Sequence, residues 1–145
     1  MAFFNIFNIA GSGMSAESVR LNTVASNLAN ADSVSGSPGS AYKARYPVFQ
    51  AVQAALASAG APDPTQGADA SVQVAGIVQS TAPATASYQP NNPLADSQGY
   101  VFSSNVNVVE QMADMISASR SYQNDAQVLE TSKSLMLDTL KLGQA

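Results

Sequence analysis

The chain has no cysteine, no histidine and no tryptophan among its 145 residues. Without cysteine it can form no disulfide and offer no thiolate nucleophile, and without cysteine and histidine it cannot build a zinc knuckle. Histidine is also the side chain that most often performs acid–base catalysis near pH 7. Many Ser and Thr hydroxyls are present, but none has a base beside it, so no catalytic triad can be assembled. The sequence therefore predicts a protein that is not an enzyme and uses no cofactor or metal.

Charge is also scarce, since charged residues make up 11% of the chain, against about 25% in typical proteins. The net charge is −4, so the sequence carries no electrostatic footprint for nucleic acid or an anionic membrane. No apolar run approaches transmembrane length, and the first residues lack the basic and apolar regions of a Sec signal peptide. We expect neither nucleic acid nor a small-molecule substrate as a partner.

The clearest pattern that is present lies in residues 107–142. Apolar residues recur there at alternating spacings of three and four, which is the period of a coiled-coil seam. The pattern predicts a helix about 50 Å long that begins at a capping box formed by Asn107 and Glu110. Lys133 occupies a seam position, where such a residue sets register or pairs with a carboxylate on a neighbouring helix. The predicted seam comprises Val108, Met112, Met115, Tyr122, Leu129, Met136 and Leu140.

A second heptad pattern, at the other end of the chain, predicts a first helix from Ile6 to about Ala31. Both helices need partners to cover their seams. The flanking side chains are small and neutral, which favours contacts with neighbours on several sides, as in an assembly. Gly11 and Gly13 either permit close approach of another helix or mark a point of fraying. The predicted seam of this helix comprises Phe7, Ala10, Met14, Leu21, Val24 and Leu28.

Between the two helices the sequence predicts a small β-rich insert. The best strand pattern covers residues 71–80, in which Gly76 marks a bulge or a close backbone contact. The valines expected on one face of this strand are Val72, Val74 and Val78, and Ile77 is expected on the other face.

The predicted fold class is mainly α with this β-rich insert. Residues 1–31 and 106–145 are expected to form a discontinuous terminal-helix domain. Residues 32–105 are expected to form an extended connection and a small outer domain. Within it, residues 60–70 are interpreted as a flexible low-complexity segment. Residues 48–59 fit either a short strand or a short Ala-rich helix.

One motif favours a different class of protein. The segment from Gly11 to Ala16 matches the G-x-G-x-x-A fingerprint of dinucleotide-binding folds, and Asp32 follows at about the right distance. However, no further strand–helix units follow it, and the heptad pattern continues through the match. We therefore interpret these glycines as part of a helix that packs against a neighbour.

The end of the first predicted helix carries a family resemblance. The run Ser26-Asn-Leu-Ala-Asn30, followed by Tyr42-Lys43, resembles the N-L-A-N box and G-Y-K segment of the bacterial flagellar rod and hook axial proteins. The connection between the two motifs is longer than in most of that family. Together with residues 90–93 and 105–122, this connection is similar to the C-type proximal rod proteins. The signature residues are Asn27, Leu28, Ala29, Asn30, Tyr42 and Lys43.

This resemblance implies a structural subunit of the flagellar basal-body rod, which spans the periplasm. The terminal helices would form the inner coiled-coil layer of a rigid tube that transmits motor torque and provides the export channel. The implied partners are further copies, other rod subunits, the rod-base adaptor protein and the flagellar type III export apparatus. The alternative is a secreted amphipathic-helix translocator or membrane-active effector. Against this alternative, the polar faces lack the Lys and Arg of membrane-surface helices.

Overall fold

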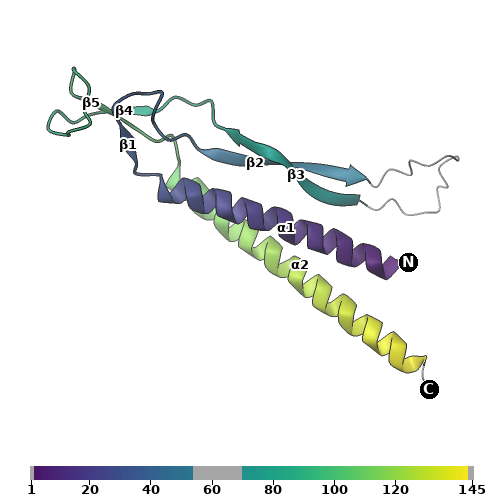
Figure 1. Cartoon of the computed structure of the whole chain (residues 1–145). Helices are drawn as coiled ribbons and strands as arrows, with labels where there is room; N and C mark the ends of the chain where they lie inside the picture. The colour runs from purple at the N-terminus through teal and green to yellow at the C-terminus, as the bar shows by residue number, and fades with distance from the viewer. Residues whose placement is uncertain (1, 54–69, 144–145) are drawn as a thin grey trace, which may run out of the picture.

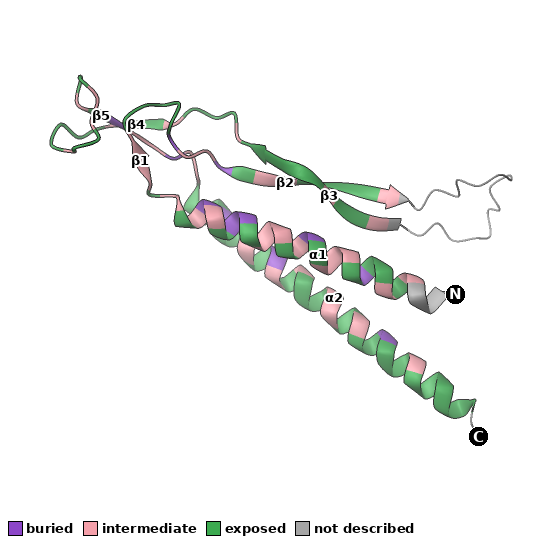
Figure 2. Ribbon diagram, viewed as in Figure 1, coloured by how far each residue is buried: buried purple, intermediate pink, exposed green. Residues whose placement is uncertain are grey.

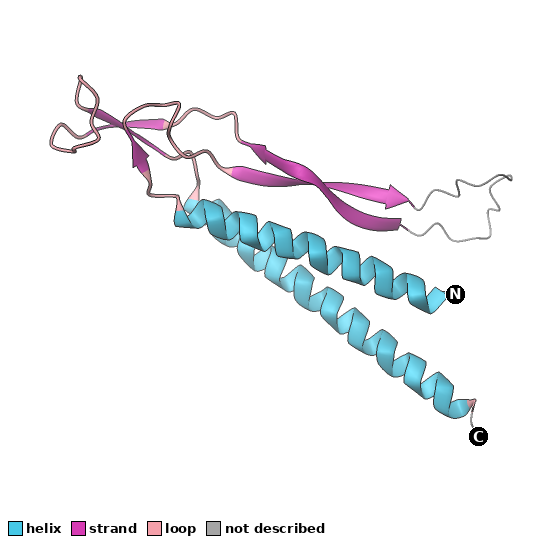
Figure 3. Ribbon diagram, viewed as in Figure 1, coloured by secondary structure: helices cyan, strands magenta, loops and turns pink. Residues whose placement is uncertain are grey.

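The computed structural model describes the backbone of residues 2–53 and 70–143. Two long helices lie against each other, and the strands form two small antiparallel sheets beside them (Figure 1, Figure 3). The helices are α1 (Ala2–Ala29) and α2 (Val108–Leu142). The strands are β1 (Val34–Ser35), β2 (Arg45–Gln53), β3 (Ala70–Gln79), β4 (Thr85–Tyr88) and β5 (Tyr100–Ser103). This confirms two long helices with a small β-rich region between them in sequence. Most of the predicted low-complexity segment, residues 60–69, lies outside the described residues.

The first helix extends about one turn further toward the N-terminus than predicted, and it ends at Ala29. Its last turn is closed by Asn30, whose Nδ2 donates a 2.8 Å hydrogen bond to the carbonyl oxygen of Ser26. The next backbone N–H, that of Ala31, bonds the carbonyl oxygen of Leu28 at 3.2 Å. This tighter i→i+3 bond satisfies a carbonyl group of the last turn while the chain leaves the helix.

The second helix begins directly after Asn107, as predicted. The side-chain oxygen of Asn107 accepts hydrogen bonds from the backbone N–H groups of Val109 and Glu110, at 3.1 and 3.3 Å. These bonds satisfy two of the donors that a helix N-terminus leaves without intrahelical partners. At the other end the N–H of Gly143 bonds the carbonyl oxygen of Thr139 at 3.1 Å. Gly143 has a φ of −79°, so the helix ends without a left-handed residue.

Strands β2 and β3 form a long two-stranded ribbon that contacts α1 along its length (Figure 1). The pairing register shifts within the ribbon, because Val48 pairs with Gly76 whereas Phe49 pairs with Val74. Ala75 is therefore the extra residue of a β-bulge, next to the glycine where the sequence predicted one. The ribbon also shows that residues 45–53 form a strand and not an Ala-rich helix.

The bulge changes which side chains of β3 face the helices. Directly paired residues of antiparallel strands point to the same side, so Ile77 shares a face with Val74, and Val78 lies on the opposite face. Ile77 lines a shallow cavity with Thr23 and Ser26 of α1. The prediction that Val78 shares the face of the other valines was therefore wrong, because strict alternation fails at a bulge.

The second sheet has the strand order β1-β5-β4 and lies at the end of the molecule where α1 ends and α2 begins (Figure 1). Its central strand holds Val101, which is fully buried. Tyr88 and Tyr100 pair across β4 and β5 with ring centroids 5.3 Å apart and edge-to-face geometry. Gly99 has a φ of +83°, and a Cβ at this position would lie 2.9 Å from Cε2 of Tyr88. The turn therefore requires glycine for both conformation and space.

The buried residues are few and mostly small (Figure 2). The buried apolar residues are Ala10, Ala16, Val24, Ala41, Ala44, Val101 and Ala118. The buried polar residues are Thr23, Asn27, Ser104, Gln111 and Ser132. Among the described residues most large apolar side chains are consequently outside the core.

Candidate functional site

The contact line between α1 and α2 is built from small and polar side chains. On α2 the buried residues are Gln111, Ala118 and Ser132, which are spaced by multiples of seven residues. This buried line lies one residue before the predicted seam. Gln111 precedes Met112, and Ser132 precedes Lys133. One residue corresponds to about 100° of helical rotation, so Met112 and Lys133 are turned away from the contact line.

The residues of the two predicted seams are divided between the contact line and the outer surface. On α1, Ala10 and Val24 are buried, and Phe7, Met14, Leu21 and Leu28 are half-buried. On α2, Met115, Leu129 and Met136 are half-buried, and Val108, Met112, Tyr122 and Leu140 are exposed. Met112 is 52% exposed and Leu140 is 58% exposed. Much of the apolar pattern of α2 is therefore open to contacts beyond this helix pair.

Asn27 joins three segments of the chain. Its Oδ1 accepts hydrogen bonds from the backbone N–H of Arg45 at 2.9 Å and from the Tyr42 hydroxyl at 3.0 Å. Its Nδ2 donates to the carbonyl oxygen of Arg45 at 2.7 Å and to Oε1 of Gln111 at 2.8 Å. The residue is 0% exposed, so its amide is satisfied entirely by protein groups. Asn27 thus ties α1 to α2 and to the start of β2.

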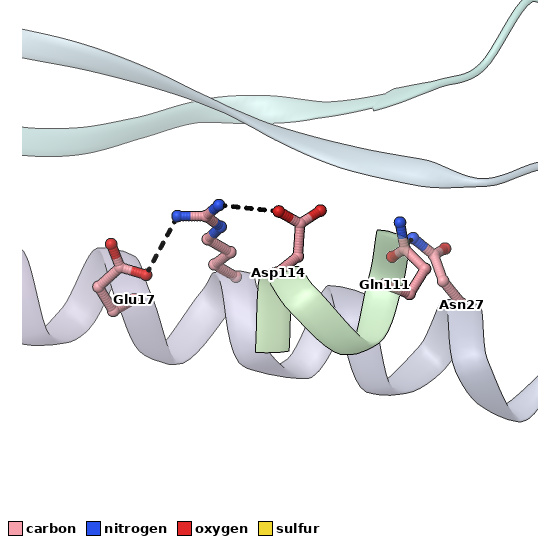
Figure 4. Close-up of polar contacts among 5 residues, drawn as sticks. Glu17, Asn27, Gln111 and Asp114 are labelled. Carbon is pink, nitrogen blue, oxygen red and sulfur yellow. Dashed lines mark hydrogen bonds and ion pairs between the residues drawn. The ribbon is translucent and has the colours of Figure 1, made fainter. Parts of the chain in front are cut away.

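These bonds fix the orientation of both amides. The backbone of Arg45 requires Oδ1 of Asn27 to face its N–H and Nδ2 to face its carbonyl oxygen. Gln111 must then turn its Oε1 toward Nδ2 of Asn27. Figure 4 draws the two side chains next to each other. As a result, the buried Nε2 of Gln111 has no hydrogen-bond partner among the described residues. An unpaired buried donor costs about 1–3 kcal/mol, so this pairing is specific but not strongly stabilising.

The structure brings the two parts of the family signature together. Asn27 and Tyr42 share a hydrogen bond, and the Tyr42 hydroxyl also lies 3.3 Å from Oγ of Ser26. Asn30 closes the end of α1. Of the other signature residues, Leu28 and Lys43 are half-buried and Ala29 is exposed. The signature is thus, in part, a polar joint between the end of α1 and the strand that follows.

An ion pair lies further along the contact between the helices (Figure 4). The guanidinium of Arg20 lies 3.2 Å from a carboxylate oxygen of Asp114 and 3.8 Å from Glu17. The Oε2 of Glu17 is buried and has no hydrogen-bond partner among the described residues. Sequence reasoning did not find this pair or the role of Gln111, because an apolar periodicity search ignores polar residues.

The glycines of the dinucleotide-like motif lie inside α1, which is continuous through them. A Cβ on Gly13 would lie 2.6 Å from Oδ2 of Asp125 on α2, whereas a Cβ on Gly11 would meet nothing within 4 Å. Gly13 therefore permits close approach of the two helices, which is one of the two roles predicted for it. A dinucleotide fold requires a strand and a tight turn at this motif, so the helix excludes that interpretation.

The described residues offer little for chemistry. They contain no group of three or more His, Cys, Asp or Glu side chains placed to hold a metal ion. None of the described helices is both long enough and apolar enough to cross a membrane.

Burial, and then the nearby carboxylates of Glu110 and Asp114, raise the pKa of Tyr46 above its ordinary value of 10.0. This phenol therefore stays protonated at neutral pH.

Large apolar side chains are exposed along both helices, whereas the residues between the helices are small or polar. They include Ile6, Ile9, Val109, Ile116, Val128, Leu135, Leu137 and Leu142, in addition to the four seam residues named above. A helix pair with small and polar residues inside and large apolar residues outside is typical of a protein that buries its surface against other chains. The fold and this surface define the class of protein as a structural subunit of an assembly.

Comparisons with known proteins identify the family. Residues 7–36 match the family described as flagella basal body rod protein, and residues 97–142 match the family described as flagellar basal body rod FlgEFG protein C-terminal. The flagellar basal-body rod protein FlgC of Salmonella typhimurium is 54% identical over 144 residues, and that of Yersinia enterocolitica is 51% identical over 145 residues. Each alignment covers 99% of this chain and 100% of the relative. The chain therefore belongs to the FlgC family of flagellar basal-body rod proteins, which are structural proteins of the rod and not enzymes.

Proposed function

We propose that the chain polymerises with other rod subunits into a rigid tube that transmits motor torque and encloses the export channel. In this proposal residues 1–31 and 106–145 form the inner helical layer, and residues 32–105 lie outside it. The observation that carries the proposal is the inverted distribution of side chains along the helices. Leu140 and Ile116 are 58% and 55% exposed, whereas Asn27 and Gln111 are 0% exposed.

This distribution is unfavourable for an isolated chain in water. Burying one large aliphatic side chain stabilises a protein by about 1.5–3 kcal/mol. The exposed apolar residues of α2 do not contribute most of this stabilisation in an isolated chain. Association with neighbouring helices would recover it. The heptad spacing of the exposed Met112 and Tyr122 with the half-buried Met115 and Leu129 favours a helix as the covering element. Contacts between different surfaces of successive subunits would then build a helical stack.

The polar joint at Asn27 supports the mechanical part of the proposal. Torque is transmitted only if the parts of each subunit keep their relative positions under load. Asn27 holds α1, α2 and the start of β2 through four hydrogen bonds between 2.7 and 3.0 Å. Sliding of either helix would leave these buried groups unpaired, so the joint resists displacement.

The small core supports export of the subunit in unfolded form through the type III apparatus. Apart from Val24 and Val101, the buried apolar residues are all alanine, so the described part of the chain buries little apolar surface. Such a chain is expected to be of low stability until it assembles. The rod-base adaptor protein and other rod subunits are the proposed partners in that assembly.

The test is complementation of a bacterial strain that lacks its own rod protein of this family. We expect the chain to restore swimming in soft agar and to be located by cryo-microscopy in the proximal rod of purified basal bodies. A chain that is exported and stable but absent from basal bodies would overturn the proposal. Substitution of Val78, exposed on the outer face of the β2–β3 ribbon, by Ala serves as a control that should complement fully.

A further inference from the structure

A groove of about 580 Å³ opens between the N-terminal half of α1, the β2–β3 ribbon and the middle of α2. Its walls are apolar and come from all three elements. They include Ile6, Ile9, Phe49, Val72 and Val128. Phe49 and Val72 belong to the ribbon, and the other three belong to the helices. All five side chains are exposed. Among the described residues the groove is therefore an open apolar surface.

Two carboxylates line the same groove, Glu17 of α1 and Asp125 of α2. The Oε2 of Glu17 is buried and accepts no hydrogen bond from the described residues. Its nearest cation is the Arg20 guanidinium at 3.8 Å, which is closer to Asp114 at 3.2 Å. Arg20 is thus shared between Glu17 and Asp114, and Asp125 takes part in none of the ion pairs of the described residues, so the groove favours an occupant that brings a positive charge. The best fit is an amphipathic segment with apolar anchors and a lysine or arginine.

The C-terminal end of α2 has this chemistry. Lys133, Leu137 and Leu140 are spaced by four and three residues, so they lie on one helical face. Leu137 and Leu140 are 48% and 58% exposed, and Lys133 is exposed and takes part in none of the ion pairs of the described residues. This face, which we call the C-terminal stripe, is defined by these three residues.

The stripe cannot reach the groove of its own molecule. The helix is continuous from Val108 to Leu142, and Leu137 lies about 18 Å along it from Asp125, at about 1.5 Å per residue. An occupant with this chemistry must therefore come from another molecule.

We propose that the C-terminal stripe of one copy docks in the groove of a second copy, with Lys133 directed toward Glu17 and Asp125. This inference rests on the proposed function, because it assigns two complementary surfaces to the assembly. The groove and the stripe are different parts of the chain, so the contact is heterologous and lets each copy bind two others, one through its groove and one through its stripe.

Sedimentation velocity of the purified full-length chain over a range of concentrations tests this contact. Val72→Arg places a cation in the groove, and Leu137→Asp places a carboxylate in the stripe. We expect each variant to weaken self-association at least tenfold. Matched controls are Val78→Arg on the opposite face of the ribbon and Leu135→Asp outside the stripe, which are 51% and 53% exposed in the wild type and should leave association unchanged.

A mixture of the two variants makes the test specific. It contains one intact groove, on the Leu137→Asp chain, and one intact stripe, on the Val72→Arg chain. We expect equal amounts of the two to form pairs but no longer oligomers. A wild-type chain that stays monomeric, controls that weaken association equally, or a mixture that forms no pairs would overturn the inference. If both variants still enter the rod of motile cells, the groove contact fails while the proposed function stands.

Discussion

Asn27 donates a hydrogen bond of 2.8 Å to Gln111, and both side chains are fully buried where α1 ends and α2 begins. The two residues are 84 positions apart in the sequence. At this place on a helix pair an apolar contact would supply more stability, whereas a buried amide pair supplies register. Its hydrogen bonds form in one alignment of the helices, and any other alignment leaves polar groups unpaired.

Replacing Asn27 by Ala should lower the free energy of unfolding by about 2–4 kcal/mol, because several buried groups lose their partner together. The backbone N–H of Arg45 and the Tyr42 hydroxyl would be among them. Urea unfolding followed by circular dichroism measures the loss. Asn22→Ala, at an exposed position of α1, is the control and should change stability by less than about 0.5 kcal/mol. Equal losses in the two variants would contradict this role.

Replacing Gln111 by Met should be much less costly, with a change below about 1.5 kcal/mol. The substitution removes the unpaired Nε2, and Nδ2 of Asn27 keeps its bond to the carbonyl oxygen of Arg45. The same urea experiment gives the comparison. If Gln111→Met is as damaging as Asn27→Ala, then Gln111 holds a partner that the structure does not show.

The two glycines of α1 should respond differently to alanine. Gly11→Ala should stabilise the chain by up to about 1 kcal/mol, because it raises helix propensity in open space. Gly13→Ala gains the same propensity, but its Cβ would lie 2.6 Å from Oδ2 of Asp125. We expect the Gly13 variant to be the less stable of the two by at least about 1 kcal/mol in thermal unfolding. Equal stabilities would mean that the Asp125 carboxylate moves aside freely.

The raised pKa of Tyr46 predicts a pH dependence above pH 10. The folded chain holds the phenol proton more tightly than the unfolded chain does, mainly because burial disfavours the phenolate. The contribution to stability is therefore complete below pH 10 and is lost as the pH rises through the folded-state pKa. Urea midpoints measured at pH 9 and pH 11 should fall less for Tyr46→Phe than for the wild type. An identical fall in both would show that Tyr46 does not contribute.

The chain should not bind membranes, in spite of its exposed apolar residues. Amphipathic helices that bind membranes carry Lys and Arg on the polar face, whereas this chain has a net charge of −4. We expect no co-sedimentation with vesicles of neutral or anionic lipid. Leu140→Asp serves as the control, because binding that the wild type shows and this variant loses would favour the membrane-active alternative.

The sequence predicted the elements well where the signal is local. The end of α2 and its Asn107 cap depend on neighbouring residues, and both were confirmed. The strand predicted at residues 71–80 lies at residues 70–79, and a bulge, one of the two features predicted at Gly76, lies next to it. The face of the strand on which Ile77 lies was predicted wrongly, because a pattern of alternation does not reveal which residue a bulge leaves unpaired.

The contact line of the helices was harder to predict than the helices themselves. A search for apolar periodicity finds the largest apolar side chains, and these lead to Met112 and Leu140 on the outer surface. The residues that face the other helix, such as Gln111 and Ser132, are polar or small and give no apolar signal. Their burial depends on partners far away in the sequence, such as Asn27, and spacing alone cannot supply those.

The extra residue in β3 has a further consequence. If Ala75 paired with Val48, so that the strand alternated evenly through it, Ile77 and Val78 would trade sides. The first helix would then meet the shorter valine, and the longer isoleucine would point outward. A deletion of this one alanine would instead keep the pairing from Gly76 to Gln79 and remove only the bulge, so Ile77 would stay on the face of Val74.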